Sequence, residues 1–384
     1  MKFIKIILKG FILIIIAAIV LLYIFDYSYI LRGAKIVYFT GHKTAFIDDY
    51  PYFDNDTIKK GNNTSPWPIH KNYNHTTPTE KLSEVNKDWG TVAFLIIKND
   101  SIWYENYHED FNKNSKTNSF SMAKSITTAL LGKAIMEGDI KSLDQPVSDY
   151  YPQYANTNVT VGDLASMASG LDWVESYTSP FSVTARANYD DDLAETILNQ
   201  KVVEAPGKAF KYLSGNTELL GMVIEKATGQ TLSNYLSESF WQRMGATDDA
   251  LWQVDDSEHR LAKAFCCISS NARDFARFGK LYKDYGKWEG KQLLDSAYVV
   301  KSITPRFKEG PEYGYGWWLK EQNNKDFFMM RGHLGQYVIV QPEDNVIIVR
   351  LGHRKSPDDG KTEAVFTNDI VTYIDEAYKM LVHD

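Results

Sequence analysis

SMAKSITTALLGKAIM, residues 121–136, is typical of a single helix, and Gly138 just beyond it is a residue that commonly ends helices. Its first turn places Ser121 and Lys124 three residues apart, so both side chains lie on one face. A serine hydroxyl becomes a nucleophile when a base takes its proton, and a partly buried lysine can be that base. The helix N-terminus also favours an oxyanion through its dipole and free N–H groups. The stretch therefore predicts a nucleophilic serine.

The S-x-x-K pair alone is a weak signal. A chain of 384 residues should contain about one such pair by chance, although this is the only match in the sequence. The competing interpretation is a serine that caps the helix and a lysine on the surface. Other segments have to decide between the two.

Strand signals lie on both sides of this helix. Residues 91–97 (TVAFLII), a turn at Asn99-Asp100 and residues 102–107 predict a β-hairpin ahead of it. Further strand signals follow much later, at residues 313–319, 327–330, 336–340 and 346–351. An amphipathic helix at about residues 364–381 is predicted to close the chain.

Between the two groups of strands, the apolar spacing is mostly helical, from residue 143 to residue 283. This part includes a helix at residues 218–228 that is predicted to end at Gly229. The order predicts an α/β protein of the α+β type, with an antiparallel sheet flanked by helices. The chain is expected to leave that sheet for a helical subdomain at about residues 140–285 and then to rejoin it.

A second motif is the loop PGKAFKYLSGN, residues 206–216. A tyrosine held near a lysine ammonium can ionise and serve as general base, so Tyr212 is a candidate, with Ser214 completing a hydrogen-bond shuttle. A tyrosine in a loop more often only packs against its neighbours. The residues leave open whether Lys124 or Tyr212 is the general base.

The third motif is RGHLGQ, residues 331–336, on the approach to a strand. It would place His333 along the rim of a site, while Gly335 would let the backbone come close to a ligand. The N–H of Gln336 would then join that of Ser121 as an oxyanion donor. The alternative is a structural histidine beside a β-bulge.

The order S-x-x-K, Y-x-S, H-x-G resembles the motifs of the penicillin-recognising serine hydrolases. Within that superfamily the chain is most similar to the class C β-lactamase-related branch, especially the 6-aminohexanoate-dimer hydrolases. The resemblance covers about residue 88 to the C-terminus. The stretches that carry it are FSMAKS (120–125), SMASGLDWVESY (166–177), SSNARDFARFG (269–279) and YGYGWW (313–318).

The resemblance implies a β-lactamase/transpeptidase-like fold, with the site between the sheet and an all-helical subdomain. It also implies an acyl-enzyme on the serine, with no cofactor and no metal. The catalytic residues it implies are Ser121, Lys124 and Tyr212, with the N–H groups of Ser121 and Gln336 as oxyanion hole. The substrate-binding residues it implies are Ser214, His333, Gly335, Trp173 and Trp317. For each tryptophan, a core role is a nearly equal alternative.

Three positions depart from the family pattern. His333 stands where β-lactamases usually have lysine, Leu334 stands where they have Thr or Ser, and Ser214 replaces an Asn. A lysine would receive the carboxylate of a penicillin or of a D-Ala-D-Ala stem. Its replacement therefore favours an ester or an uncharged amide as substrate.

Composition excludes several classes of function. The net charge of -7 argues against nucleic acid as a partner, because phosphate binding requires a basic face. Cys266 and Cys267 are the only cysteines, and neighbouring cysteines rarely bridge, so both are expected to be small buried residues. The spacing of His70 and His75 would not place them on one face of a helix, and they are not expected to bind a metal. Oligomeric state is left open.

The N-terminus is expected to be a membrane anchor. Residues 10–25 (GFILIIIAAIVLLYIF) are unbroken apolar sequence, and with residues 3–8 they offer about 20 residues to a bilayer. Lysines at positions 2, 5 and 9 would keep the N-terminus in the cytoplasm and place the rest outside it. A cleaved signal peptide is the alternative, although residues 26–33 offer no small-x-small cleavage site.

The sequence thus predicts an anchor (1–25), an extended polar tether (26–88) and a serine hydrolase domain (89–384), the domain lying outside the cytoplasm. Esters or amides are the expected substrates. The nearest alternatives are a D-alanyl-D-alanine carboxypeptidase and a weak β-lactamase. More distant ones are a non-catalytic binding or sensor protein on the same scaffold, and a structural envelope protein.

Overall fold

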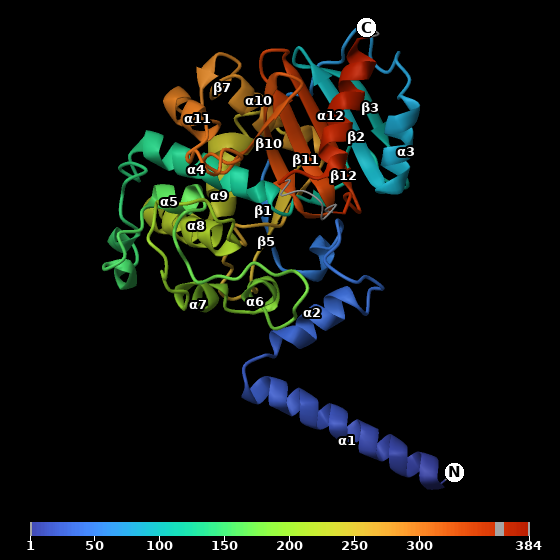
Figure 1. Cartoon of the computed structure of the whole chain (residues 1–384), viewed down its shortest axis with the longest axis vertical. Coiled ribbons are helices and arrows are strands. Elements are labelled where there is room, and N and C mark those ends of the chain that lie inside the picture. The colour runs from blue at the N-terminus through green and yellow to red at the C-terminus, as the bar shows by residue number, and fades with distance from the viewer. Residues whose placement is uncertain (1, 358–364, 383–384) are drawn as a thin grey trace.

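A six-stranded antiparallel sheet forms the centre of the fold, in a computed structural model that describes residues 2–357 and 365–382 (Figure 1). The strand order is β3-β2-β12-β11-β10-β9. The strands are β2 (Thr91–Lys98), β3 (Ser101–Tyr107), β9 (Trp318–Gln322), β10 (Lys325–Gly332), β11 (Gln336–Gln341) and β12 (Val346–Gly352). The first hairpin and the last four strands share one sheet, so the predicted sheet that the chain leaves and rejoins is confirmed.

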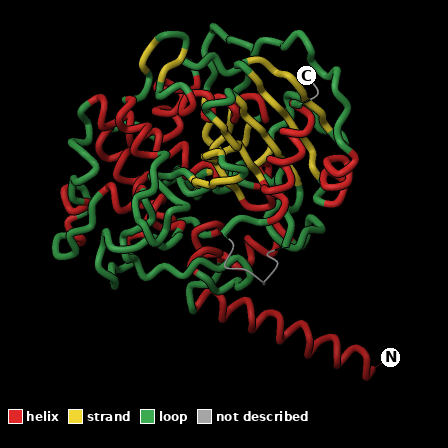
Figure 2. The backbone as a smooth tube through the Cα atoms, turned by 45° about the horizontal axis from the view of Figure 1, so that its top comes forward, coloured by secondary structure: helices red, strands yellow, loops and turns green. Residues whose placement is uncertain are grey.

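Helices cover both faces of the sheet; in Figure 2 they are the red segments around the yellow strands. One face packs against α3 (Glu80–Asp88) and α12 (Asn368–Leu381), and the other packs against α10 (Ala272–Lys283) and α4 (Met122–Glu137). Coverage on both sides explains why β2 and β12 are near-continuous apolar runs. The expected start of the last helix, near Ala364, lies outside the described residues.

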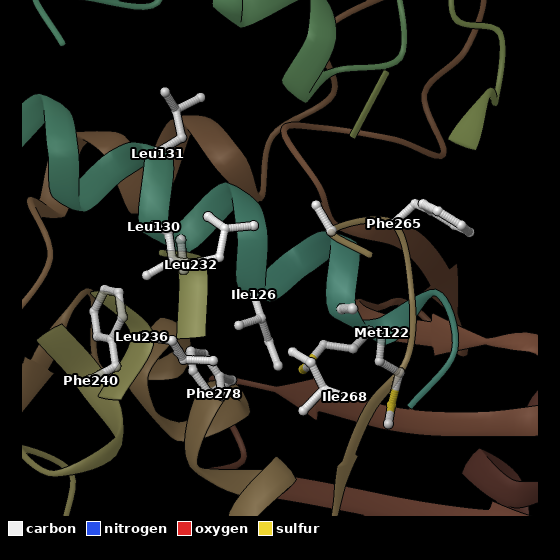
Figure 3. Close-up of a cluster of buried hydrophobic side chains, with 14 of the residues drawn as sticks. Met122, Ile126, Leu130, Leu131, Leu232, Leu236, Phe240, Phe265, Ile268 and Phe278 are labelled. Atoms are coloured by element: carbon white, nitrogen blue, oxygen red, sulfur yellow. The ribbon is translucent and has the colours of Figure 1, made fainter. Parts of the chain in front are cut away.

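Helix α4 runs through the main hydrophobic core, which explains its apolar residues on every side. Figure 3 shows Ile126, Leu130 and Leu131 of this helix among side chains from other elements. Replacing a leucine such as Leu130 by alanine should cost about 2–5 kcal/mol of stability. Gly138 ends the helix with φ of 90°, as predicted. The candidate nucleophile therefore stands at the start of a rigid, well-packed element.

A layer of helices packs beside α4. It consists of α5 (Val161–Ala165), α6 (Val183–Tyr189), α7 (Leu193–Leu198), α8 (Ser214–Thr228) and α9 (Leu232–Leu236). The helix expected at 218–228 begins four residues earlier, because Leu213 is the last extended residue before it. The expected helical stretch 140–285 is not wholly helical. It also contains β5 (Ala250–Gln253) and β6 (Ile268–Ser270), and α10 within it packs on the main sheet.

A small second sheet joins segments that are distant in sequence, in the order β1-β5-β6-β4. Its outer strands are β1 (Asn55–Ile58) and β4 (Thr117–Asn118), the latter lying just before Ser121. Outside both sheets and the helical layer are α11 (Ser296–Ser302), β7 (Lys287–Trp288) and β8 (Lys291–Gln292).

The N-terminal region has two parts. Helix α1 (Lys2–Ile24) projects from the body, as Figure 1 shows, and is the one helix in the described part of the chain that is long and apolar enough to cross a membrane. Residues 26–88, expected to be an extended polar tether, contain α2 (Tyr29–Val37), β1 and α3. The sequence did not predict these elements. They pack onto the domain, and β1 pairs with β5.

The cysteine prediction was half wrong. Both side chains are buried, as expected, but Cys266 and Cys267 are joined in a disulfide between neighbours. Cys267 has φ of 75°, a left-handed conformation that reshapes the chain enough to bring the two sulfurs together.

Candidate active site

Ser121 and Lys124 form the centre of the site. Ser121 occupies the N-cap position of α4, yet its side chain caps no backbone N–H. Instead, Lys124 Nζ donates to Ser121 Oγ at 3.0 Å and to the backbone carbonyl of Phe265 at 2.8 Å. Lys124 is only 2% exposed. The alternative of a capping serine with a surface lysine is therefore wrong.

Burial prepares Lys124 to act as a base. Loss of solvent lowers the pKa of Lys124 to about 8, and the carboxylates of Glu175 and Glu218 offset part of that effect. A neutral amine is thus accessible near physiological pH, which a lysine in water does not offer. The hydrogen bond to the Phe265 carbonyl helps to hold the Lys124 amine nitrogen at hydrogen-bonding distance from the Ser121 hydroxyl.

Tyr212 lies beside both Ser121 and Lys124. The amine nitrogen is 5.0 Å from the centre of the tyrosine ring, and the Tyr212 hydroxyl makes a hydrogen bond with Ser121. Burial and the carboxylate of Glu175 raise the pKa of Tyr212 above its ordinary value, and the hydrogen bond with Ser121 and the charge of Arg331 only partly oppose them. The tyrosine is therefore a neutral phenol at physiological pH, suited to pass on a proton rather than to start as the base.

His333 lies in the tight turn between β10 and β11. Its ring stacks on Tyr177, with centroids 5.3 Å apart, and meets Phe120 edge-on at 5.6 Å. Burial lowers the pKa of His333 to about 4, and the nearby positive charge of Lys355 adds to the effect. The imidazole is therefore neutral at physiological pH, and the position carries no cation for a substrate carboxylate.

Gln336 opens β11 opposite Gly332. Its side chain points inward and is used by β12: Nε2 donates to the Gly352 carbonyl at 2.7 Å, and Oε1 accepts from the Gly352 N–H at 3.0 Å. A Cβ on Gly332 would collide with the Ser119 carbonyl, so the end of β10 lies directly against the segment before Ser121. The Gln336 backbone is thus carried to the site, while its side chain is not.

Comparisons with known proteins agree with this arrangement. The family model described as beta-lactamase matches residues 81–371, most of the chain. The chain belongs to the beta-lactamase family.

Among curated proteins, this beta-lactamase-family chain is 27% identical to the 6-aminohexanoate-dimer hydrolase of Paenarthrobacter ureafaciens, over 70% of this chain and 74% of that one. The match supports the sequence-based resemblance, and the chain is a serine hydrolase of the beta-lactamase-related type.

Solved structures share the fold. A Bacillus anthracis protein provisionally assigned as a 6-aminohexanoate-dimer hydrolase is 22% identical, with a TM-score of 0.75 over 92% of this chain and 94% of that one. A penicillin-binding protein from Bacillus halodurans is 19% identical, with a TM-score of 0.61 over 77% of this chain and 99% of that one.

In this beta-lactamase-family chain, Glu175 organises residues around the candidate pair Ser121 and Lys124. Its carboxylate accepts hydrogen bonds from Ser214 N at 2.7 Å, Ser214 Oγ at 2.8 Å, Trp173 Nε1 at 2.9 Å and the Tyr177 hydroxyl at 2.5 Å. An acceptor at the first N–H of α8 is a favourable helix cap. Ser214 is therefore held by Glu175. The sequence analysis quoted Glu175 within residues 166–177 but gave it no role.

The two tryptophans named by resemblance differ in position. Trp173 is 1% exposed, packs against Gly215 and donates a hydrogen bond to Glu175. It therefore holds the residues around the site from within the core. Trp317 is fully buried against Tyr282, with ring centroids 4.3 Å apart, and against Phe328 at 5.2 Å. Trp317 is therefore a core residue, which agrees with the core role that the sequence left as a nearly equal alternative.

The neighbouring Trp318 takes the position expected of Trp317. It is half-buried, and its ring centre lies 5.4 Å from that of Tyr212. The rings of Phe210 and Tyr313 have their centres 6.0 Å and 5.0 Å from that of Trp318, and together they form an aromatic wall beside Tyr212. The guanidinium of Arg331 lies over Trp318 at 5.0 Å. The motif YGYGWW carried this signal, but it did not indicate which tryptophan faces the site.

Gly335 is also used differently from the expectation. It has φ of 86°, and a Cβ there would collide with the guanidinium of Arg350, which donates to the Gly335 carbonyl at 2.7 Å. The close approach that the glycine permits is to Arg350. Its role toward a substrate stays a prediction.

One group of possible metal ligands occurs in the described residues: Asp255, Asp256 and His259. Both carboxylates already accept hydrogen bonds from backbone N–H groups: Asp255 accepts from the N–H of Leu261 at 2.8 Å, and Asp256 accepts from that of His259 at 2.6 Å. The cluster caps a loop and gives no indication of a metal centre.

Proposed function

We propose that the chain hydrolyses esters or uncharged amides through an acyl-enzyme on Ser121. The observation that carries the proposal is the buried Lys124 amine, 3.0 Å from Ser121 Oγ and with a pKa near 8. Such a contact has no structural necessity, because the hydroxyl caps nothing and the lysine is costly to bury. A base held on a serine hydroxyl is the arrangement that acyl transfer requires.

In acylation, neutral Lys124 takes the proton of Ser121 as Oγ attacks the substrate carbonyl. The N–H groups of Ser121 and Gln336 stabilise the oxyanion. The bond to the leaving group then breaks, and that group takes a proton from the Tyr212 hydroxyl, which is replenished from the Lys124 ammonium. In deacylation a water attacks the acyl carbonyl and gives a proton to neutral Lys124. The ester bond to Ser121 Oγ then breaks, Oγ takes that proton from the Lys124 ammonium, and the acid leaves.

The direct test is intact-mass spectrometry after incubation with a fluorophosphonate. One adduct should form on the wild type and map to the peptide that contains Ser121. Ser121→Ala should form none and should keep its fold, because the half-buried hydroxyl contributes little to packing. A folded wild-type protein without any adduct would instead support a binding protein on this scaffold.

The surroundings of Ser121 support an uncharged acyl group. A neutral His333 offers no cation to a carboxylate, and the wall formed by Phe210, Tyr313 and Trp318 suits an apolar group. We expect turnover of p-nitrophenyl esters with little labelling by a fluorescent penicillin. Strong labelling by that penicillin would favour a D-alanyl-D-alanine carboxypeptidase or a weak β-lactamase.

The site faces the extracytoplasmic side in this proposal, with α1 as an uncleaved anchor. Support comes from the length of α1, its fully exposed apolar surface, and the lysines at its N-terminal end. Protease added to intact spheroplasts should digest the domain while α1 stays with the membrane. If the mature protein lacks residues 1–25 by mass spectrometry, α1 is a signal peptide.

A further inference from the structure

The N-terminal segment that precedes the family match reaches the backbone next to Ser121. Ile47 and Asp49 are both buried, and both contact Asn118 of β4. The Asn118 N–H donates to the Ile47 carbonyl at 2.6 Å, and Asn118 Nδ2 donates to Asp49 Oδ1 at 2.9 Å. Gln253 Nε2 holds the same Asp49 oxygen at 2.9 Å.

Asn118 in turn holds the residue before the nucleophile. Its Oδ1 accepts the N–H of Phe120 at 2.8 Å. Phe120 has φ of 44°, a left-handed conformation that is strained for an aromatic residue and persists only when its surroundings enforce it. This bend sets the direction in which Ser121 leaves the turn and enters α4.

The two ends of the Asn118 amide are therefore coupled. Asn118 is fully buried, and only one orientation of its amide lets Oδ1 face the Phe120 N–H. Burial raises the pKa of Asp49 to about 7, but its Oδ1 already accepts from both Asn118 Nδ2 and Gln253 Nε2 and so has no proton to donate to Asn118 Oδ1. Asp49 therefore selects that orientation. Without Asp49, the buried Nδ2 loses its hydrogen-bond acceptor. The observed orientation of the Asn118 amide is then less favourable, and the amide can rotate to find another partner.

We propose that Asp49 is a positioning residue for the active site: acting through Asn118, it holds the Phe120 turn that aims Ser121 at Lys124. The N-terminal extension is then part of the catalytic framework as well as the link to α1. The inference rests on the proposed function of Ser121. The part of the chain that the family model matches begins at residue 81 and does not include Asp49.

The chain provides a matched control. Asp48 is exposed, whereas its neighbour Asp49 is only 3% exposed. Asp49→Asn is a second control, because it removes the charge but retains Oδ1, the single oxygen that accepts from both Asn118 and Gln253. Asp49→Ala removes that oxygen. The three variants separate the hydrogen bond from charge and from general surface effects.

The experiment measures the rate of fluorophosphonate labelling of full-length protein in detergent, corrected for the folded fraction by thermal melting. Asp49→Ala should label about 10 to 100 times more slowly, because a small misplacement of the nucleophile has a large effect. The labelling rate of Asp49→Asn should lie within about threefold of the wild-type rate, and that of Asp48→Ala should equal the wild-type rate. If Asp49→Ala does not fold, Asp49→Ser replaces it, since serine is too short to reach Asn118.

A double-mutant cycle adds a readout that a general structural role would not move. If Asp49 acts through Asn118, then Asp49→Ala combined with Asn118→Ala should label no more slowly than Asn118→Ala alone. Additive losses, or an Asp49→Ala protein that labels at the wild-type rate, would overturn the inference. A wild-type protein that is folded but never labelled would overturn the proposed function instead.

Discussion

Two buried lysines, Lys124 and Lys263, differ in what lies beside the amine. Lys124 donates to the Phe265 carbonyl at 2.8 Å, and Lys263 donates to the Asn188 carbonyl at 2.8 Å. Burial lowers the pKa of the first to about 8 and of the second to about 7. By pKa alone, Lys263 is the better base at neutral pH.

The difference lies in the second contact of each amine. Lys124 Nζ also donates to Ser121 Oγ at 3.0 Å, whereas Lys263 lies 4.0 Å from the centre of the Phe53 ring. Asp49, a buried acid, lies close enough to Lys263 to raise its pKa. A lowered lysine pKa therefore does not identify a catalytic base, and the hydroxyl within hydrogen-bonding distance does.

Lys124→Met should break this comparison most strongly. Methionine keeps the volume and removes the base, so labelling and ester turnover should fall by about 10³-fold, within the range for loss of a general base. The measurement is the single-turnover labelling rate, with Lys263→Met as the matched buried control. A loss of only a few-fold would assign the base to Tyr212.

Tyr212→Phe should have the next largest effect. The ring and its contact with Trp318 are retained, and only the hydroxyl that bonds to Ser121 is lost. We expect turnover of an amide, whose leaving group needs a proton, to fall by about 100-fold. A p-nitrophenyl ester should lose much less, because its leaving group departs without protonation. Equal losses on both substrates would contradict a role in proton delivery.

The pH dependence of labelling distinguishes the two lysines without a mutation. The rate should rise about tenfold per pH unit below the Lys124 pKa of about 8 and level off above it, because only the neutral amine is a base. A plateau that already begins near pH 7 would indicate that Lys263, with its lower pKa, controls the rate.

Lys263→Met should have the smallest effect on catalysis. Labelling per folded molecule should stay within about twofold of wild type, while the lost hydrogen bond to Asn188 costs about 1–3 kcal/mol of stability. The folded state holds fewer protons than the unfolded state between the folded pKa of about 7 and the ordinary lysine value. Lys263 thus makes stability rise with pH in that window, and denaturant unfolding should show a flatter profile in the variant.

The contact between Ser121 and Lys124 could be predicted from the sequence because it is local. Ser121 and Lys124 share one helical turn, so their proximity follows from helix geometry. Tyr212 and His333 are distant from Ser121 in the sequence, so predicting them at the site needed the resemblance to a family. Glu175 and Asp49 carried no local pattern at all. Their roles arise from hydrogen bonds to Ser214 and Asn118 that no spacing in the sequence encodes.

The sequence left the role of Trp317 open for a simple physical reason. Trp317 and Trp318 are neighbours where the chain enters β9, and successive residues of an extended chain point to opposite faces. Deciding which of them reaches Tyr212 requires the register of the strand and the identity of the covered face. Neither can be read from YGYGWW. The cysteine error is similar, because the left-handed backbone at Cys267 depends on how the loop is packed.

The contact between Asp26 and Arg186 has a consequence for how the protein meets its substrate. Arg186 binds both the carboxylate of Asp26, at 2.7 Å, and its backbone carbonyl, only two residues after α1 ends. On the proposed topology, this contact holds the domain close to its membrane anchor, with no long flexible linker between them. Catalysis then becomes a surface process: enzymes diffuse in two dimensions, at a fixed height above the lipid, and substrates delivered along the bilayer meet them at a higher effective concentration than those arriving from bulk solution.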